Sequence, residues 1–96
     1  MNKYLILILH RGIQARIESF KLRNEQLEIF KRSNELSIKS LQARLKGDTD
    51  TYNNLWQQSI DLKNDAKSVG EESLTLQEKA SNLEGIYYSL CEEFAK

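Results

Sequence analysis

Aliphatic residues recur every seventh position through the second half of the chain. The series is Leu55, Leu62, Val69, Leu76, Leu83 and Leu90. Three residues ahead of each member runs a second series, small in the middle and aromatic at the ends: Tyr52, Ser59, Ala66, Ser73, Ala80, Tyr87 and Phe94. Two interleaved series at this spacing are typical of the core positions of a coiled coil. They predict a helix over about residues 51–95, and their unbroken phase favours one helix over a break at Gly70.

The first half of the chain carries the same kind of pattern. Its aliphatic series is Ile8, Ala15, Leu22, Ile29, Leu36 and Ala43, and its small series is Gly12, Ser19, Gln26, Ser33, Ser40 and Gly47. Gln26 is the one member of the small series with a long side chain. The pattern predicts a helix over about residues 3–46. A turn over residues 47–50 follows, because Gly47 can end a helix and Asp48, Thr49 or Asp50 can cap the next one.

Together these elements predict an all-α fold, a long antiparallel two-helix hairpin of the coiled-coil type that forms one domain over residues 1–96. With the turn at 47–50, aliphatic residues whose numbers sum to 98 face each other. The small series then pairs at a sum of 99, which places Ser40 by Ser59, Ser33 by Ala66, Ser19 by Ala80, Gly12 by Tyr87 and Gly47 by Tyr52. Small residues on both sides allow the helix axes to approach closely.

A second apolar series on the first helix has no partner inside this hairpin. We call it the apolar stripe; its members are Ile6, Ile13, Ile17, Phe20, Leu27, Ile38, Leu41 and Leu45. A monomer would expose it to water, so we expect a partner chain to cover it and complete a four-helix bundle. The predicted partner-binding residues are Ile6, Leu9, Ile13, Ile17, Phe20, Asn24, Leu27, Lys31, Asn34, Ile38, Leu41, Leu45, Trp56 and Ile60. Asn24, Lys31 and Asn34 either select the partner from a buried position or form a solvated middle of the stripe.

The opening run Tyr4–Leu9 bears on localisation. It has six apolar residues before His10-Arg11, whereas a membrane-spanning helix needs about 20 and a signal peptide also needs small residues at a cleavage site. We therefore expect no membrane span and a cytoplasmic protein, with secretion without a cleaved signal as the alternative.

Charge is distributed unevenly although the net charge is zero. Residues 1–48 hold ten Lys/Arg and five Asp/Glu, and residues 49–96 hold four and nine. Such halves attract when they fold side by side. Nucleic-acid binding by the basic first helix is a weaker alternative, because aromatic residues do not interleave with its cations.

Nothing in the sequence points to catalysis, a cofactor or a metal. His10 and Cys91 are single residues of their kind, and no third residue is evident that would orient the imidazole toward the thiol. Carboxylate pairs such as Glu25/Glu28 lie on highly charged helices, where they typically serve solubility. We expect no enzymatic activity.

The segment Tyr88-Ser-Leu-Cys-Glu92 forms a Tyr-x-x-x-Glu pattern near the C-terminus. It resembles the small Trp-x-Gly family of type VII secretion substrates, which implies a secreted hairpin that works as a homo- or heterodimer. The chain departs from that family at the turn, where Gly47-Asp48 replaces Trp-x-Gly and Trp56 is followed by Gln57-Gln58. The architecture is equally similar in shape to coiled-coil chaperones and export components of type III secretion.

The function that the sequence favours is a non-enzymatic interaction module, an adaptor or chaperone-like coiled coil. It would bind a protein with amphipathic helices, or further copies of itself, and could serve a specialised bacterial secretion system. The type VII-like substrate and the nucleic-acid-associated protein are the two alternatives.

Overall fold

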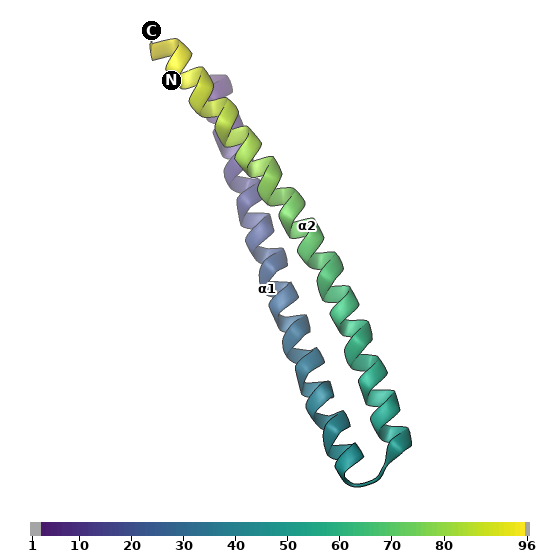
Figure 1. Cartoon of the computed structure of the whole chain (residues 1–96). Coiled ribbons are helices and arrows are strands. Elements are labelled where there is room, and N and C mark those ends of the chain that lie inside the picture. The colour runs from purple at the N-terminus through teal and green to yellow at the C-terminus, as the bar shows by residue number, and fades with distance from the viewer. Residues whose placement is uncertain (1–2, 96) are drawn as a thin grey trace. The chain divides into compact units, whose positions relative to one another are not determined.

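A computed structural model of the chain describes residues 3–95 and contains two α-helices there, α1 (Lys3–Leu45) and α2 (Thr49–Ala95). They run antiparallel and pack against each other (Figure 1). The predicted all-α antiparallel hairpin is confirmed. The absence of proline and the scarcity of glycine allow helices of this length, and α2 continues without interruption through Gly70.

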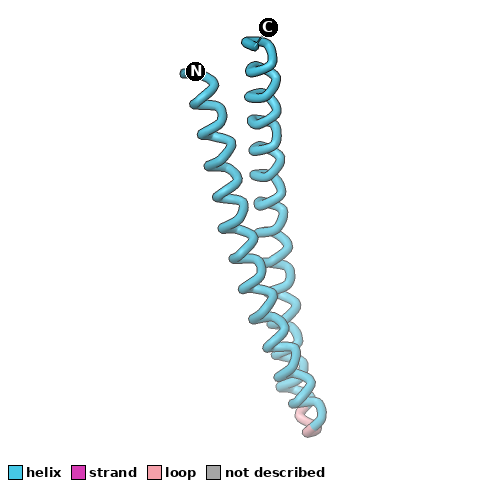
Figure 2. The backbone as a smooth tube through the Cα atoms, turned by 90° about the vertical axis from the view of Figure 1, so that its left-hand side faces the viewer, coloured by secondary structure: helices cyan, strands magenta, loops and turns pink. Residues whose placement is uncertain are grey.

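The turn between the helices is shorter than predicted (Figure 2). Gly47 has a φ of +81°, and its N–H donates to the Arg44 carbonyl at 3.0 Å, while the Asp48 N–H donates to the Ala43 carbonyl at 3.0 Å. This is the Schellman arrangement, in which a left-handed glycine satisfies the last carbonyls of a helix. The side chain of Asp48 then accepts a hydrogen bond from the Thr51 N–H at 3.1 Å. Asp48 thus both completes the end of α1 and caps the start of α2.

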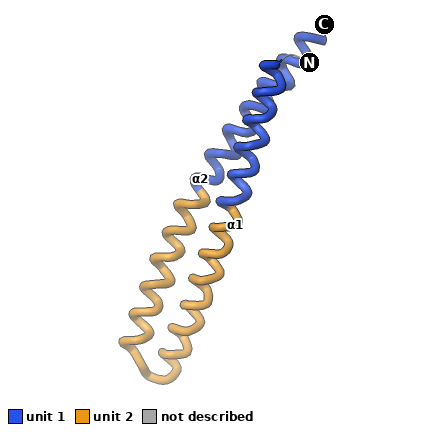
Figure 3. The backbone as a smooth tube through the Cα atoms, turned by 180° about the vertical axis from the view of Figure 1, so that it is seen from behind, with its two compact units in different colours: residues 1–22, 71–96 blue, residues 23–70 orange. Residues whose placement is uncertain are grey.

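The helices divide into two compact units, each an antiparallel pair of segments (Figure 3). Unit 1 comprises residues 1–22 and 71–96, and unit 2 comprises residues 23–70, including the turn. In unit 1 the fully buried polar contact joins Ser19 and Ser73, whose hydroxyls lie 3.1 Å apart and each donate to the other's backbone carbonyl. In unit 2 the Ser33 hydroxyl lies 3.1 Å from that of Ser59 and donates to the Ser59 carbonyl at 2.9 Å.

These contacts show that the predicted register is wrong by one heptad. Facing small residues have numbers that sum to 92, so Ser33 meets Ser59 and not Ala66, and Ser19 meets Ser73 and not Ala80. Ser40 instead donates to the carbonyl of Ser37 in its own helix. When one helix slides along the other by seven residues, the heptad pattern matches again, so the pattern cannot choose between the two registers. The length of the turn does choose, and the short Lys46–Asp48 turn gives the register in which facing residue numbers sum to 92.

The predicted pairing of glycines with aromatics is also wrong, and for the same reason. A Cβ placed on Gly12 would stand 3.5 Å from the Cβ of Leu83 and 3.6 Å from the carbonyl oxygen of Ala80, so its neighbours are not Tyr87. Nothing lies within 4 Å of a Cβ placed on Gly47. The glycine that does accommodate a large side chain is Gly70, against which the amide of Gln26 packs. This contact explains the polar residue in the small series of α1.

Most buried positions in both units hold small side chains, and the large exception is Leu5, which is 5% accessible. The largest fully buried ones are serines: Ser19, Ser33, Ser40 and Ser59. Ala66 and Ala80 are also fully buried, whereas the aliphatic series is half-buried at positions such as Leu36 and Leu62. Much of the apolar surface of the helices therefore remains accessible.

Candidate protein interface

The apolar stripe is exposed in unit 1. Ile6, Ile13, Ile17 and Phe20 each keep about half of their surface accessible, between 47% and 54%. Leu9, the other predicted partner-binding residue of this unit, is half-buried. Helical spacing of three or four residues places consecutive members on neighbouring turns of α1, so their side chains form a continuous apolar surface within the unit.

In unit 2 the stripe is more exposed still. Leu27 and Ile38 are 58% accessible and Leu45 is 88% accessible, with Leu41 at 48%. The polar members Asn24, Lys31 and Asn34 are exposed as well. From α2, Trp56 lies at the surface and Ile60 is half-buried.

One ion pair identifies the side of unit 1 on which these residues lie. Arg16 donates from Nε and from an Nη to the two carboxylate oxygens of Glu84, at 3.0 Å and 2.9 Å. Ile13 and Phe20 lie three residues before and four residues after Arg16, and Tyr88 lies four residues after Glu84, so all three share this side. We call it the stripe flank of unit 1.

In unit 2, considered by itself, two contacts mark the side on which Leu41, Trp56 and Ile60 lie. The Ser37 hydroxyl lies 2.5 Å from that of Ser59, and Gln26 packs against Gly70. Leu41 lies one turn after Ser37, so the two share a side of α1. On α2, Trp56 lies two heptads before Gly70, and Ile60 lies one turn after Trp56. We call this side, which combines side chains of both helices, the stripe flank of unit 2.

Cations lie over the aromatic rings on this part of unit 2. Tyr52 and Trp56 stack with their centroids 6.1 Å apart. The Arg44 guanidinium lies 5.1 Å from the Tyr52 centroid, and the Lys63 ammonium lies 5.6 Å from the Trp56 centroid. Both distances fall within the range of cation–π attraction, which positions the two positive charges beside Trp56.

The opposite side of unit 1 is polar. A shallow groove there is lined by Arg11, Gln14, Glu18 and Lys79 together with Ala15 and Leu83. Ile86 lies on α2 beside the small residues Ser81, Gly85 and Ser89 of a second shallow groove. It is two residues, or about 200° of helix, from Glu84, so it points away from the stripe flank.

Exposed apolar residues of α2 were only partly predicted. Leu74, Tyr88 and Ile86 are 58%, 64% and 48% accessible, and none was among the predicted partner-binding residues. Leu7 on α1, which flanks the start of the stripe, is 45% accessible and also lies outside the predicted partner-binding set. Leu74 lies two heptads after Ile60 and Tyr88 two heptads after Leu74, so extending that spacing along α2 would have identified both.

The remaining candidate chemistry is modest. Among residues 3–95, no three His, Cys, Asp or Glu side chains are grouped so that they could hold a metal ion. A hydrogen bond with Cys91 raises the pKa of Tyr87 above its ordinary value, with burial and the charge of Cys91 contributing. His10 is exposed. Neither described helix is long and apolar enough to cross a membrane.

Comparisons with known proteins supply no identity. No protein-family model matches the chain, and no curated protein or solved structure matches it either.

Proposed function

We propose that the protein is a non-enzymatic interaction module of the adaptor or chaperone-like kind, which binds a helical protein partner through the apolar stripe of α1. The observation that carries this proposal is the row of half-exposed aliphatic and aromatic side chains on α1 in both units. Soluble proteins rarely leave such rows uncovered, because each exposed side chain forgoes the free energy of its burial.

The accessible surface of the chain supports the same proposal. It measures 7213 Å², whereas a folded monomer of 11.2 kDa typically exposes about 5,700 Å². The excess, on the order of 1,500 Å², is larger than the ~800 Å² that each partner buries in an interface of standard size. Docking a second pair of helices on the stripe would cover part of this excess.

A set of matched substitutions tests the proposal. Ile13 and Leu41 of the stripe are 47% and 48% accessible, and Ile86, away from it, is 48% accessible. In Ile13→Asp and Leu41→Asp a buried charge would oppose complex formation, whereas Ile86→Asp is a control of equal exposure. We expect size-exclusion chromatography with light scattering, on protein purified from its native cells, to show a complex for wild type and Ile86→Asp only.

Circular dichroism of each variant provides the control for folding, since an exposed substitution leaves the helix content unchanged. Complexes that survive Ile13→Asp and Leu41→Asp as well as they survive Ile86→Asp would contradict the proposal.

A further inference from the structure

Two rows of residues, each at seven-residue steps, line the stripe flank of unit 2. We call them the flank rows: Arg23, Phe30, Ser37 and Arg44 on α1, and Trp56, Lys63 and Gly70 on α2. Arg44 lies over the ring of Tyr52, on which Trp56 stacks, so both rows lie on the same side of unit 2. Four further residues each lie four positions after one row member and three before the next, which places them beside the rows: Leu27, Leu41, Ile60 and Lys67.

The charged residues of this flank are all basic: Arg23, Arg44, Lys63 and Lys67. All four are exposed. The ion pairs formed by residues 3–95 contain Arg16 in unit 1 and Arg32 in unit 2, and none of the four flank cations takes part in one. The flank therefore carries positive charge that no carboxylate of the described chain neutralises.

The acidic residues of unit 2 lie on other sides of its helices. Outside Asp48 in the turn they are Glu25, Glu28, Glu35, Asp50, Asp61 and Asp65. Each lies two positions before or after Tyr52 or a member of the flank rows. Two positions correspond to about 200° of helix, so these carboxylates point away from the flank. Glu28 and Glu35 do border the apolar stripe, but along the edge that is turned away from the flank.

Apolar side chains of both helices are interspersed with the four cations. Leu27 and Leu41 of α1 and Trp56 of α2 are exposed, while Phe30 and Ile60 are half-buried. Rows at helical spacing on two adjacent helices form ridges and grooves into which the side chains of another helix can pack. Such a helix would bury apolar surface and would also meet unneutralised positive charge.

The aromatic rings of this flank are poorly placed to stack on nucleic-acid bases. Tyr52 and Trp56 stack on each other, and the cations of Arg44 and Lys63 lie over their rings. Single-stranded nucleic acids bind by stacking successive bases on open ring faces. The most exposed apolar side chains of the flank are instead the leucines of α1, which suit the apolar face of a helix.

We infer that the stripe flank of unit 2 binds an acidic amphipathic helix, whose apolar face packs on Leu27, Leu41 and Trp56 and whose Asp and Glu side chains meet the four cations. This inference rests on the proposed function and specifies the chemistry of the partner. Burial of the apolar face drives association, and charge complementarity selects the partner. A basic helix with the same apolar face would bring like charges together.

Trp56 permits a direct test, because it is the single tryptophan of the chain and belongs to the flank. The probes are two peptides of about 20 residues, about 30 Å long as helices. Both have the same leucine face and lack tryptophan, and the positions beside that face are glutamate in one and lysine in the other. Titrations of the full chain, followed by Trp56 fluorescence, measure both affinities. We expect the acidic peptide to bind on the order of tenfold more tightly at low salt, and the preference to shrink as salt is added.

Charge reversal provides matched variants. Lys63→Glu/Lys67→Glu reverses two of the four flank cations and should abolish the preference for the acidic peptide. Arg32→Glu/Lys39→Glu changes the net charge equally but should keep the preference, because each of these residues lies two positions beyond a member of the flank row on α1. Circular dichroism shows whether both variants retain the helix content of the wild type.

Several results would overturn the inference. Equal binding of the two peptides, with both lost in Leu41→Asp, leaves the proposed function standing and removes the acidic partner. A preference for the basic peptide, or one for the acidic peptide that Lys63→Glu/Lys67→Glu retains, also contradicts the inference. Quenching of Trp56 by single-stranded oligothymidylate, without a response to the acidic peptide, assigns the flank to nucleic acid. No response to either peptide overturns the inference, whereas the native complex and its Leu41→Asp variant still test the proposed function.

Discussion

Ser19 and Ser73 show at the scale of single residues how this hairpin holds two helices together without large side chains. Both hydroxyls are buried, and each donates to the backbone carbonyl of the other residue. The polar atoms are thereby satisfied, while the side chains remain small enough for close packing. In unit 2 the Ser33 hydroxyl donates to the Ser59 carbonyl, and the Ser59 hydroxyl forms hydrogen bonds with the hydroxyls of Ser33 and Ser37.

Substitution of Ser19 should separate the roles of size and polarity. Ser19→Ala retains the small size, and Ser73 can still donate to the carbonyl of residue 19, so we expect a loss within about 1 kcal/mol. Ser19→Leu places a large side chain where no space exists and should cost about 1–3 kcal/mol. Urea unfolding of both variants measures the difference, and equal losses would contradict this view of the core.

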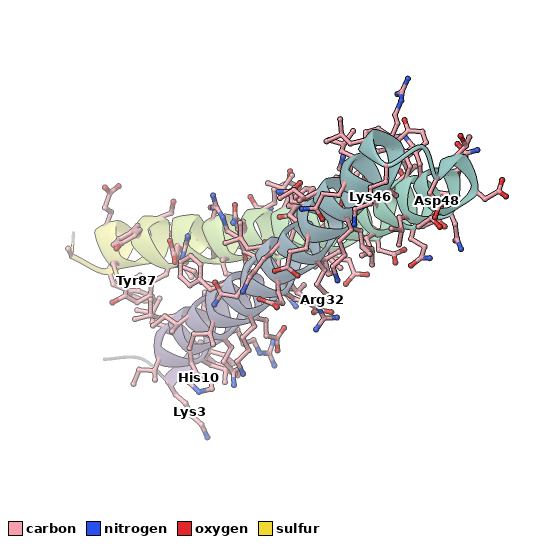
Figure 4. All side chains as sticks on the ribbon, turned by 90° about the horizontal axis from the view of Figure 1, so that it is seen from below. Lys3, His10, Arg32, Lys46, Asp48 and Tyr87 are labelled. Atoms are coloured by element: carbon pink, nitrogen blue, oxygen red, sulfur yellow. The ribbon has the colours of Figure 1, made fainter. Side chains whose placement is uncertain are left out.

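Asp48 makes the turn sensitive to acid. Its side chain accepts hydrogen bonds from the Thr51 hydroxyl at 2.6 Å and from the Thr51 N–H, and these lower the pKa of Asp48 below its ordinary value of 3.8. Figure 4 shows Asp48 at the end of the molecule where the helices join. A carboxyl with a lowered pKa stabilises the fold at pH values above 3.8, and this contribution is lost as the pH falls through the lowered value.

We therefore expect the melting temperature of the wild type to fall more between pH 7 and pH 3 than that of Asp48→Asn. Asparagine caps a helix comparably well but does not titrate. Thermal melts followed by circular dichroism at the two pH values test this. A pH dependence unchanged by Asp48→Asn would show that other carboxyls account for it.

At the scale of the helix, the two glycines inside α2 have different surroundings. Gly85 has open space above it, with no atom within 4 Å of the position that a Cβ would occupy. At Gly70 a Cβ would stand 2.9 Å from Cδ of Gln26, so the side chain of Gln26 would have to move. Glycine thus only weakens the helix at position 85, whereas at position 70 it also makes room for the side chain of Gln26.

Alanine substitution should reveal this difference. Gly85→Ala should stabilise the protein by about 0.5–1 kcal/mol, because alanine loses less backbone entropy in a helix. Gly70→Ala should gain less, and the double variant Gly70→Ala/Gln26→Ala should regain the difference. Thermal or urea unfolding measures all three; an equal gain at both glycines would contradict the contact between Gly70 and Gln26.

The helices themselves could be predicted from the heptad pattern, because helical periodicity and the lack of breakers act locally. The register could not, because Ser33 fits opposite Ser59 or Ala66 equally well by pattern. The choice depends on Asp48 serving both helix ends, a detail of hydrogen bonding. The stripe was likewise visible as periodicity, and the sequence already placed Tyr88 near its end, whereas the side of unit 1 on which Tyr88 lies follows from the Arg16–Glu84 pair.

For the molecule as a whole, self-association through the stripe would make stability depend on concentration. If the stripe is covered by a second copy, mass action favours the folded dimer as the concentration rises. A hundredfold increase should raise the melting temperature on the order of 10 °C. Melts of wild type and Ile13→Asp over that range test this expectation, and a concentration-independent wild type would contradict it.

The small buried side chains have a consequence for the turnover of the protein in a cell. Because the fully buried positions hold serine and alanine and the leucines of both helices are mostly half-buried, a chain without a partner should open readily. Opened chains are the substrates of cellular proteases. Turnover should therefore be fast for chains whose stripe is uncovered and slow once a partner covers it, so the amount of partner sets how much of the protein accumulates.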